Sequence, residues 1–193
     1  MLNHIRPAVV MIALFTGVLG VAYPLAVTGV AQAAFPGQAN GSLVRDKAGQ
    51  VVGSALVGQS FAQPGYLHPR PSAAGKGYDA AASSGSNLGP LNPDLIARVK
   101  TDADALRAET GKAVIPADAV TTSASGLDPH ISPAYAELQV ARIASARGVG
   151  EAQVREVIRQ HEEGRTFVLG QPRVNVLLTN MALDARFPHP AEG

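Results

Sequence analysis

The longest apolar stretch of the chain lies within its first forty residues. No charged residue occurs between Arg6 and Arg45, and residues 8–31 are mostly aliphatic. A helix rises about 1.5 Å per residue, so this stretch would span roughly 36 Å, which exceeds the hydrocarbon core of a bilayer at about 30 Å. The pattern therefore predicts a single transmembrane helix over residues 8–31.

A cleaved signal peptide is the alternative interpretation of the same stretch. The sequence Ala31-Gln32-Ala33 fits the small-x-small pattern of a signal cleavage site. The apolar region of a signal peptide, however, usually covers only about 7–15 residues. The longer stretch found here favours a helix that is retained as a membrane anchor.

The basic residues that flank the stretch predict its orientation. Arg6 and the partly charged His4 precede it, and no positive residue follows it before Arg45. Because basic residues are retained on the inner side of the membrane, residues 1–7 are expected in the cytoplasm. The soluble domain, residues 35–193, is then expected in the periplasm, with the anchor in the cell inner membrane.

Beyond the anchor, the apolar pattern first takes the form of a β-hairpin. β-branched residues around Val44 and Val51 flank Asp46-Lys47-Ala48-Gly49, a turn-forming sequence, and the hairpin is expected within residues 42–61. Residues 63–93 are instead rich in Pro, Gly, Ser and Ala. An irregular segment of that length in a small domain is usually functional or disordered.

Three helices are predicted from capping residues and from apolar positions at helical spacing. The first starts at the N-cap Asn92, with Pro93 at its first position, and stops at Gly111. The second is expected over residues 132–148 and the third over residues 151–163, where apolar residues recur at intervals of three and four.

Two shorter apolar segments complete the pattern. Residues 166–169 are expected to form a strand, and residues 174–183 form a last apolar run. Strands first, then helices, then mixed elements indicate an α+β protein. The predicted architecture is one N-terminal transmembrane helix followed by a single mixed α/β extracytoplasmic domain.

Composition narrows the classes of function. The 16 basic and 15 acidic residues are spread along the chain, so the basic stripe expected of a nucleic-acid-binding protein is missing. There is no cysteine. This excludes disulfides, Cys-ligated zinc, iron–sulfur clusters and thiol catalysis.

Motifs for catalysis are also missing from the sequence. It contains no phosphate-binding GxxxxGK[ST] loop, no HExxH and no GxSxG. The five histidines lack the spacing of metal ligands, and His161 is expected to be a core or capping residue. His130 beside Asp128 could serve as a general base, and an extracytoplasmic hydrolase that uses this pair is the alternative function.

Two polar segments are candidate interaction surfaces. Residues 82–87 and 121–129 are rich in hydroxyls and glycine, and the second leads into the predicted helix at Ser132, whose N-terminal amides could bind an anion. A flexible linker and ordinary capping are the structural alternatives. Docking is favoured over anion binding because residues 121–133 include no basic residue, the nearest being Lys112 and Arg142.

The same segments resemble a known family. Six runs occur in that family's order after a single N-terminal helix: GSALVGQSF (53–61), YLHPRPSAAG (66–75), ASSGSNLGPLNP (82–93), TSASGLDPHISP (122–133), QVARIASARGV (139–149) and GQPRVNVLLTNMAL (170–183). Together they cover most of the chain. They are similar to the C subunit of the Kdp potassium-transporting ATPase, the KdpC family.

The resemblance implies a non-catalytic subunit of a P-type ATPase complex. In that complex the A subunit binds potassium, the B subunit hydrolyses ATP and the F subunit is a small helix. The C subunit is regarded as a catalytic chaperone that raises the ATP affinity of the B subunit. The partner subunits would thus bind ATP, magnesium and potassium, and membrane lipid would surround the anchor. This chain would bind no cofactor of its own and no nucleic acid.

The resemblance also names candidate residues for nucleotide binding. A glutamine-bearing segment of the family has been likened to the ABC-transporter signature. The nearest match here is a loop with Ser123, Ser125 and Gly126, next to Asp128, together with Gln139 farther along the chain. A domain outside the cytoplasm could not touch ATP, so the effect on ATP would travel through the membrane subunits as a coupling free energy.

Overall fold

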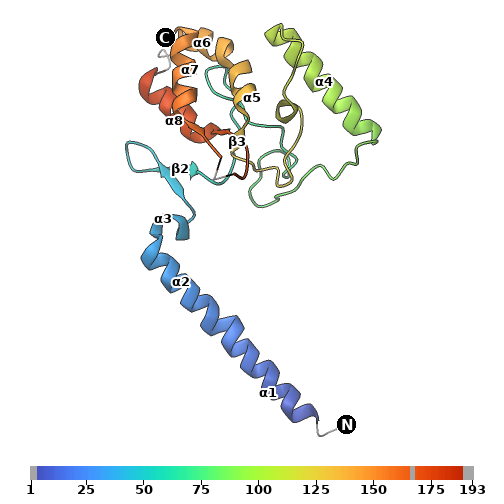
Figure 1. The fold of residues 1–193 in the computed structure, drawn as a ribbon, viewed down its shortest axis with the longest axis vertical. Coiled ribbons are helices and arrows are strands. Elements are labelled where there is room, and N and C mark those ends of the chain that lie inside the picture. Colours follow the sequence, from blue (N-terminus) through green and yellow to red (C-terminus); the bar gives the residue numbers. More distant parts are fainter. Residues whose placement is uncertain (1–3, 166–167, 189–193) are drawn as a thin grey trace. The chain divides into compact units, whose positions relative to one another are not determined.

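The computed structural model describes residues 4–165 and 168–188, and the chain divides into two compact units, Met1–Val52 and Gly53–Gly193 (Figure 1). The first unit begins with one continuous helix, Ile5–Ala34, of 30 residues and mean hydropathy 2.1. It is long and apolar enough to cross a membrane, and none of its residues, all of which are described, is buried. The predicted apolar helix is confirmed, and it extends beyond residues 8–31 at both ends.

The long helix has three parts because its central turns are wider than an α-helix. The α-helices α1 (Ile5–Phe15) and α2 (Tyr23–Ala34) flank the π-helix η2 (Thr16–Ala22). The amide of Tyr23 donates to the carbonyl of Val18, five residues back. Pro24 follows at the start of α2 and has no amide proton, so the irregular turn lies where the regular ladder of hydrogen bonds is interrupted.

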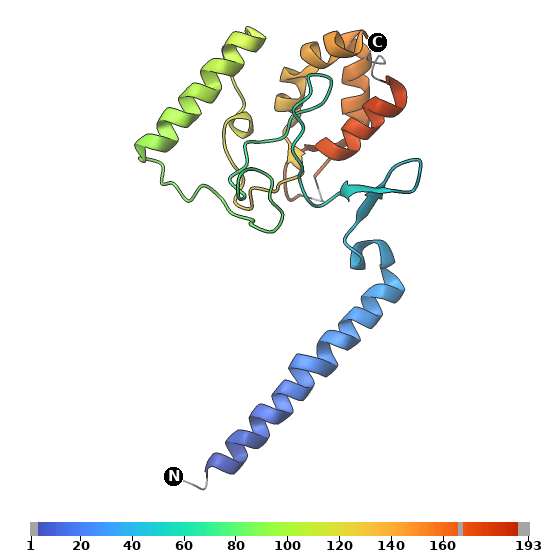
Figure 2. The ribbon, with the colours of Figure 1, turned by 180° about the vertical axis from the view of Figure 1, so that it is seen from behind.

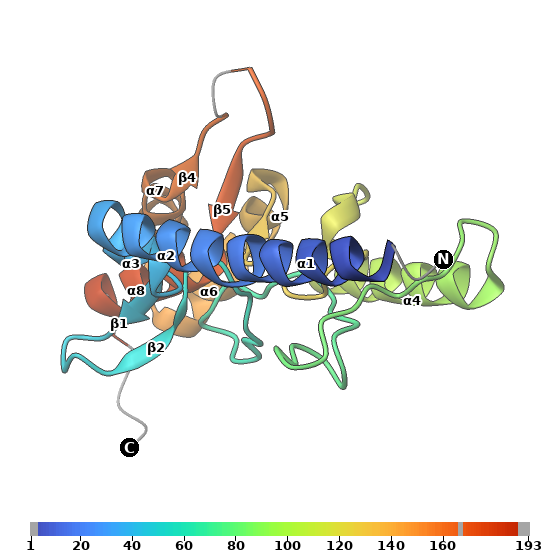
Figure 3. The ribbon, with the colours of Figure 1, turned by 90° about the horizontal axis from the view of Figure 1, so that it is seen from below.

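A short helix and a hairpin follow in the chain. Helix α3 (Pro36–Ala39) precedes the strands β1 (Leu43–Arg45) and β2 (Val51–Ser54), which pair with each other (Figure 3). The predicted hairpin is confirmed, although its second strand ends before residue 61. In the turn, the Asp46 carboxylate accepts hydrogen bonds from the amides of Ala48 and Gln50, at 2.9 and 2.8 Å.

Besides α4, which is described below, and the 3-10 helix Ala117–Ala119, the described part of the second unit contains four helices and a small antiparallel sheet. The helices are α5 (Pro133–Leu138), α6 (Val140–Arg147), α7 (Glu151–Gln160) and α8 (Val176–Arg186). The strands β3 (His130–Ile131), β4 (Glu162–Glu163) and β5 (Arg173–Asn175) form a sheet in the order β3-β5-β4. Figure 3 shows β4 and β5 side by side. The architecture is therefore mixed α/β, as expected.

The core of this unit is aliphatic. The most deeply buried aliphatic side chains come from the helices, the sheet and the segment before α4: Leu67, Ile131, Val140, Ile143, Val154, Val157, Val174 and Leu183. Helix α7 has a strongly one-sided pattern and buries Val154, Val157 and Ile158 against its neighbours. Burial of each such side chain contributes about 1.5–3 kcal/mol.

Helix α4 (Pro93–Thr110) starts and ends as predicted, but it packs differently from the others. The Asn92 side chain accepts hydrogen bonds from the amides of Asp94 and Leu95, and Gly111 ends the helix in the left-handed conformation, with φ 67°. Of its residues, all of which are described, Ala103 is the buried one. Most of α4 is therefore exposed.

Several predicted boundaries were wrong. The helix expected over residues 132–148 is divided into α5 and α6 at Gln139, and the helix expected over 151–163 ends at Gln160, because His161 caps it and the next two residues join the sheet. The apolar run over 174–183, to which no element was assigned, begins as β5 and turns into α8 at the N-cap Asn175. Of the strand expected over 166–169, the first two residues lie outside the described residues and Val168 lies in a turn.

Candidate functional site

The irregular segment 58–92 is fully described and contains no helix or strand, but it is packed against the helices of the second unit. Figure 2 shows it as the cyan-to-green trace between β2 and α4. Leu67 and Ala74 are completely buried. Of the two alternatives left open by composition, disorder is thus excluded for this part of the segment.

Two buried amide side chains bind the backbone of this segment as a neighbouring strand would. The Asn180 side chain accepts from the amide of Leu67 at 2.7 Å and donates to its carbonyl at 3.0 Å. Gln139 makes the same pair of bonds with His68, at 2.7 and 3.1 Å. Because Gln139 is only 5% exposed and both ends of its amide are engaged, its observed role is structural.

Two arginine side chains donate hydrogen bonds to the backbone just before Leu67. The buried Arg147 donates to the carbonyls of Gly65 and Phe187, each at 2.6 Å, and forms an ion pair with Asp184 at 2.8 Å. Arg142 donates to the carbonyls of Pro64 and Tyr66, at 2.6 and 3.0 Å. We call Gln139, Arg142, Arg147 and Asn180 the loop clamp.

The second polar segment, residues 121–129, is bound by an arginine that was not among the candidate residues predicted from the sequence. Arg70 forms an ion pair with Asp128 at 3.0 Å and donates to the carbonyls of Thr121 and Thr122, at 3.3 and 3.2 Å. Burial alone would raise the pKa of Asp128, but hydrogen bonds from His130 and the charge of Arg70 outweigh it and lower that pKa. The one cation at this segment is therefore already neutralised among the described residues.

The candidate residues of this segment are engaged in its internal structure. The Ser125 hydroxyl accepts from the Leu127 amide at 3.1 Å and lies 3.4 Å from the Ser123 hydroxyl. Gly126 accepts from the Ser72 hydroxyl at 2.6 Å and has φ 67°, and a Cβ there would lie 2.5 Å from the Ser84 carbonyl oxygen. Only glycine fits at this position without a shift of backbone.

The expected anion site at Ser132 already has an acidic neighbour. The carboxylate of Asp118 accepts hydrogen bonds from the amide of Ser132 at 2.6 Å and from its hydroxyl at 2.9 Å. The same hydroxyl accepts a hydrogen bond from the amide of Tyr135 at 3.0 Å and so caps α5. A negative side chain thus occupies the start of α5, where a phosphate would otherwise bind. Helix α5 also has only 6 residues.

The ring of His130 contacts two carboxylates and an amide. One ring nitrogen lies 3.6 Å from Asp128, and the other lies 3.7 Å from Glu163 and 3.5 Å from the Asn175 amide. Within the described chain, these contacts of the ring include carboxylates and an amide but no hydroxyl. The described residues also contain no group of three or more His, Cys, Asp or Glu that could hold a metal ion.

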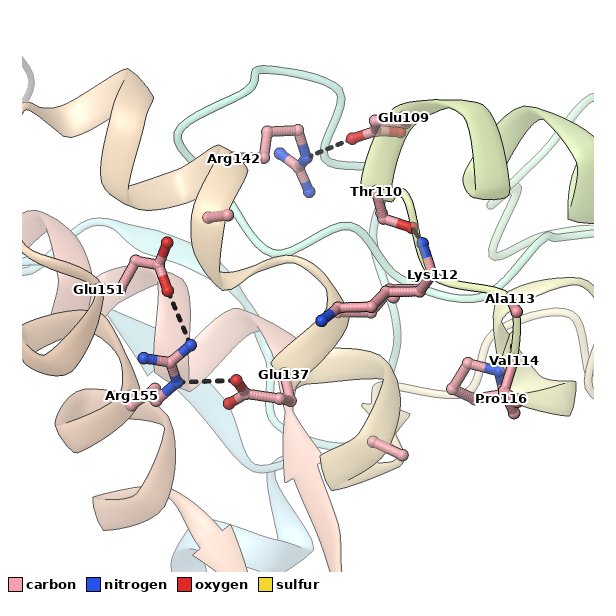
Figure 4. Close-up of a pocket in the computed structure, with 13 residues that line it drawn as sticks. Glu109, Thr110, Lys112, Ala113, Val114, Pro116, Glu137, Arg142, Glu151 and Arg155 are labelled. Atoms are coloured by element: carbon pink, nitrogen blue, oxygen red, sulfur yellow. Dashed lines mark hydrogen bonds and ion pairs between the residues drawn. The ribbon is translucent and has the colours of Figure 1, made fainter.

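A pocket of about 910 Å³ lies between the end of α4 and helices α5 to α7 (Figure 4). Its apolar lining includes Leu138 and Ala141. Its acidic residues are engaged in ion pairs: Arg142 with Glu109 at 3.2 Å, and Arg155 with Glu137 and Glu151 at 2.7 and 2.8 Å. Figure 4 shows the Lys112 side chain extending into the pocket from the other side.

Comparison with known proteins shows the family to which the chain belongs. Residues 5–185 match the family described as KdpC: K+-transporting ATPase, c chain. A potassium-transporting ATPase KdpC subunit of Caulobacter sp. (strain K31) is 68% identical over 189 residues, covering 97% of this chain and 96% of its own length.

More distant relatives carry the same description. The potassium-transporting ATPase KdpC subunit of Beijerinckia indica is 59% identical over 191 residues, covering 97% of this chain and 96% of its own length. That of Myxococcus xanthus is 59% identical over 189 residues, covering 96% and 88% respectively. The chain therefore belongs to the KdpC family, the c chain of K+-transporting ATPases.

Proposed function

We propose that this subunit docks on its partners in the potassium-uptake complex, stabilises the assembly and raises the ATP affinity of the ATP-hydrolysing B subunit without contacting nucleotide. The observation that carries the proposal is the state of the 121–129 segment. Arg70, the arginine that contacts this segment, is paired with Asp128, and Asp118 occupies the adjacent helix start. A triphosphate would meet negative charge there, whereas a protein surface can use the exposed Ala124 and Ser125.

The proposed topology supports an indirect effect on ATP. The helix Ile5–Ala34 would anchor the chain in the inner membrane, with Arg6 at its cytoplasmic end and residues 35–193 in the periplasm. Gln32 lies within α2 and exchanges hydrogen bonds with Asn40, so the helix runs through the possible cleavage sequence. Such a domain acts on the B subunit through a coupling free energy, typically about 1–3 kcal/mol.

This placement implies that different subunits of the complex bind potassium and ATP. The A, B and small F subunits are the proposed partners, and they handle potassium, ATP and magnesium, while this chain hydrolyses nothing. The rigid domain that the loop clamp holds together would present a preformed surface to them, which lowers the entropy cost of association.

A point substitution on the docking surface tests the proposal. Ala124 is exposed, so Ala124→Arg adds bulk and charge without disturbing the packed backbone at Gly126. We expect this variant to recover less ATPase subunit on co-purification and to raise the KM for ATP of the assembled pump. Thr101→Arg, on the exposed part of α4, is the matched control and should do neither.

Calorimetry of the purified subunit with ATP completes the experiment, and no binding is expected. Micromolar binding of ATP, about −8 kcal/mol, combined with normal assembly of the Ala124→Arg chain, would overturn the proposal.

A further inference from the structure

The hairpin of β1 and β2 follows the apolar helix at short range. Residues 35–42 connect Ala34 to Leu43, and four of them form α3. With about 1.5 Å per helical and 3.5 Å per extended residue, this connection spans at most roughly 20 Å. The two hydrogen bonds between the side chains of Gln32 and Asn40, at 3.2 and 3.3 Å, tie the connection back to the last turns of the helix.

One face of the hairpin presents apolar side chains to solvent. The amide of Asp46 donates to the carbonyl of Gln50 at 2.9 Å, and this pairing places Leu43, Arg45 and Val51 on the same face. Leu43 is 50% exposed and Val51 is 48% exposed. Within the described chain β1 pairs only with β2, and a two-stranded hairpin is marginally stable in water by itself. This face therefore needs a covering layer.

The charges around that face match an anionic surface. Arg45 and Lys47 are the first basic residues after the helix. The acidic residue between them, Asp46, turns its carboxylate toward two backbone amides of the turn. Lys47 is exposed and makes no ion pair with the described residues. Exposed aliphatic side chains beside basic ones are the composition of segments that bind at membrane interfaces.

We propose that this hairpin lies in the headgroup region of the bilayer, as a second lipid contact beside the transmembrane helix. Leu43 and Val51 would face the acyl boundary, and Arg45 and Lys47 would meet lipid phosphates. The short connection argues for lipid over a distant partner, because it keeps the hairpin near the membrane surface. The inference rests on the proposed membrane anchor.

Fluorescence quenching in vesicles tests the contact with the full-length chain. Because the chain lacks cysteine, single variants can carry a fluorophore at chosen sites. We choose Val51→Cys in the hairpin, Leu19→Cys in the apolar helix and Lys100→Cys on exposed α4. The vesicles contain phosphatidylcholine and phosphatidylglycerol, with a nitroxide either on an acyl carbon near the headgroup or on one near the bilayer centre. The label at residue 51 should lose emission with the shallow nitroxide and the label at residue 19 with the deep one, whereas the label at residue 100 reports the background.

The outcomes separate the hairpin from the anchor. Quenching at residue 19 combined with only background quenching at residue 51 would overturn the hairpin contact and leave the anchor intact. Background quenching at residue 19 would overturn the anchor itself, and the inference with it.

Charge reversal in the turn supplies a second readout. With the label at residue 51, quenching should be stronger in phosphatidylglycerol-containing vesicles than in neutral ones, and Lys47→Glu should reduce that difference. Lys76→Glu, an exposed lysine of the second unit, is the matched control and should leave it unchanged. Quenching that is the same in both kinds of vesicle and in both variants would overturn the role of lipid charge.

Discussion

Replacing Asn180 with alanine should destabilise the second unit more than any surface substitution. The side chain is 1% exposed and makes both hydrogen bonds to the backbone of Leu67, which is fully buried. Without it, one amide and one carbonyl lose their partners away from water, at about 1–3 kcal/mol each. The expected loss is roughly 2–6 kcal/mol, a large part of a stability of about 5–15 kcal/mol.

Urea unfolding of the full chain in detergent, followed by the near-ultraviolet circular dichroism of its tyrosines, measures this loss. Gln160→Ala is the control, because Gln160 bonds Glu156 on an exposed helix face and its removal should cost less than about 0.5 kcal/mol. A loss below that value for Asn180→Ala as well would refute the idea that the amide holds segment 58–92 in place.

Further predictions concern pH, backbone and anchoring. Burial and the charge of Arg142 lower the pKa of His68 from its ordinary 6.5, so the folded state favours the neutral ring. Stability should therefore fall as pH drops below about 6.5 and through the folded pKa. The urea midpoints at pH 7.5 and 5.5 should differ less for His68→Gln than for the unchanged protein. Gly126→Ala should destabilise the chain more than Gly111→Ala in thermal melts, since both have φ 67° but only Gly126 lacks space for a Cβ, and equal losses would contradict this. The mature chain should stay in the membrane after alkaline carbonate extraction, whereas an N-terminus at Ala34 would establish cleavage.

Local signals predicted much of the fold. Asn92, Pro93 and Gly111 bounded α4 correctly because caps and terminators act through neighbouring residues. The hairpin turn was equally local. The division at Gln139 was missed because glutamine is a good helix former and its partner, the backbone of His68, lies 71 residues away in the chain.

The candidate site depended on contacts that no local pattern contains. Composition predicted an irregular segment over residues 63–93, but its order comes from Asn180, 113 residues from Leu67, and from Arg147, 82 residues from Gly65. Arg70 was overlooked because it reaches Asp128 across 58 positions. Sequence reasoning therefore found the polar segments, whereas the partners that neutralise them required the fold.

The placement of the second unit outside the cytoplasm is the claim on which the indirect effect on ATP depends. A cysteine introduced at the exposed Thr101 would be the only thiol in the chain. In intact cells this Thr101→Cys protein should react with a membrane-impermeant thiol reagent. Labelling that occurs only after the cells are broken would place the unit in the cytoplasm and contradict the account.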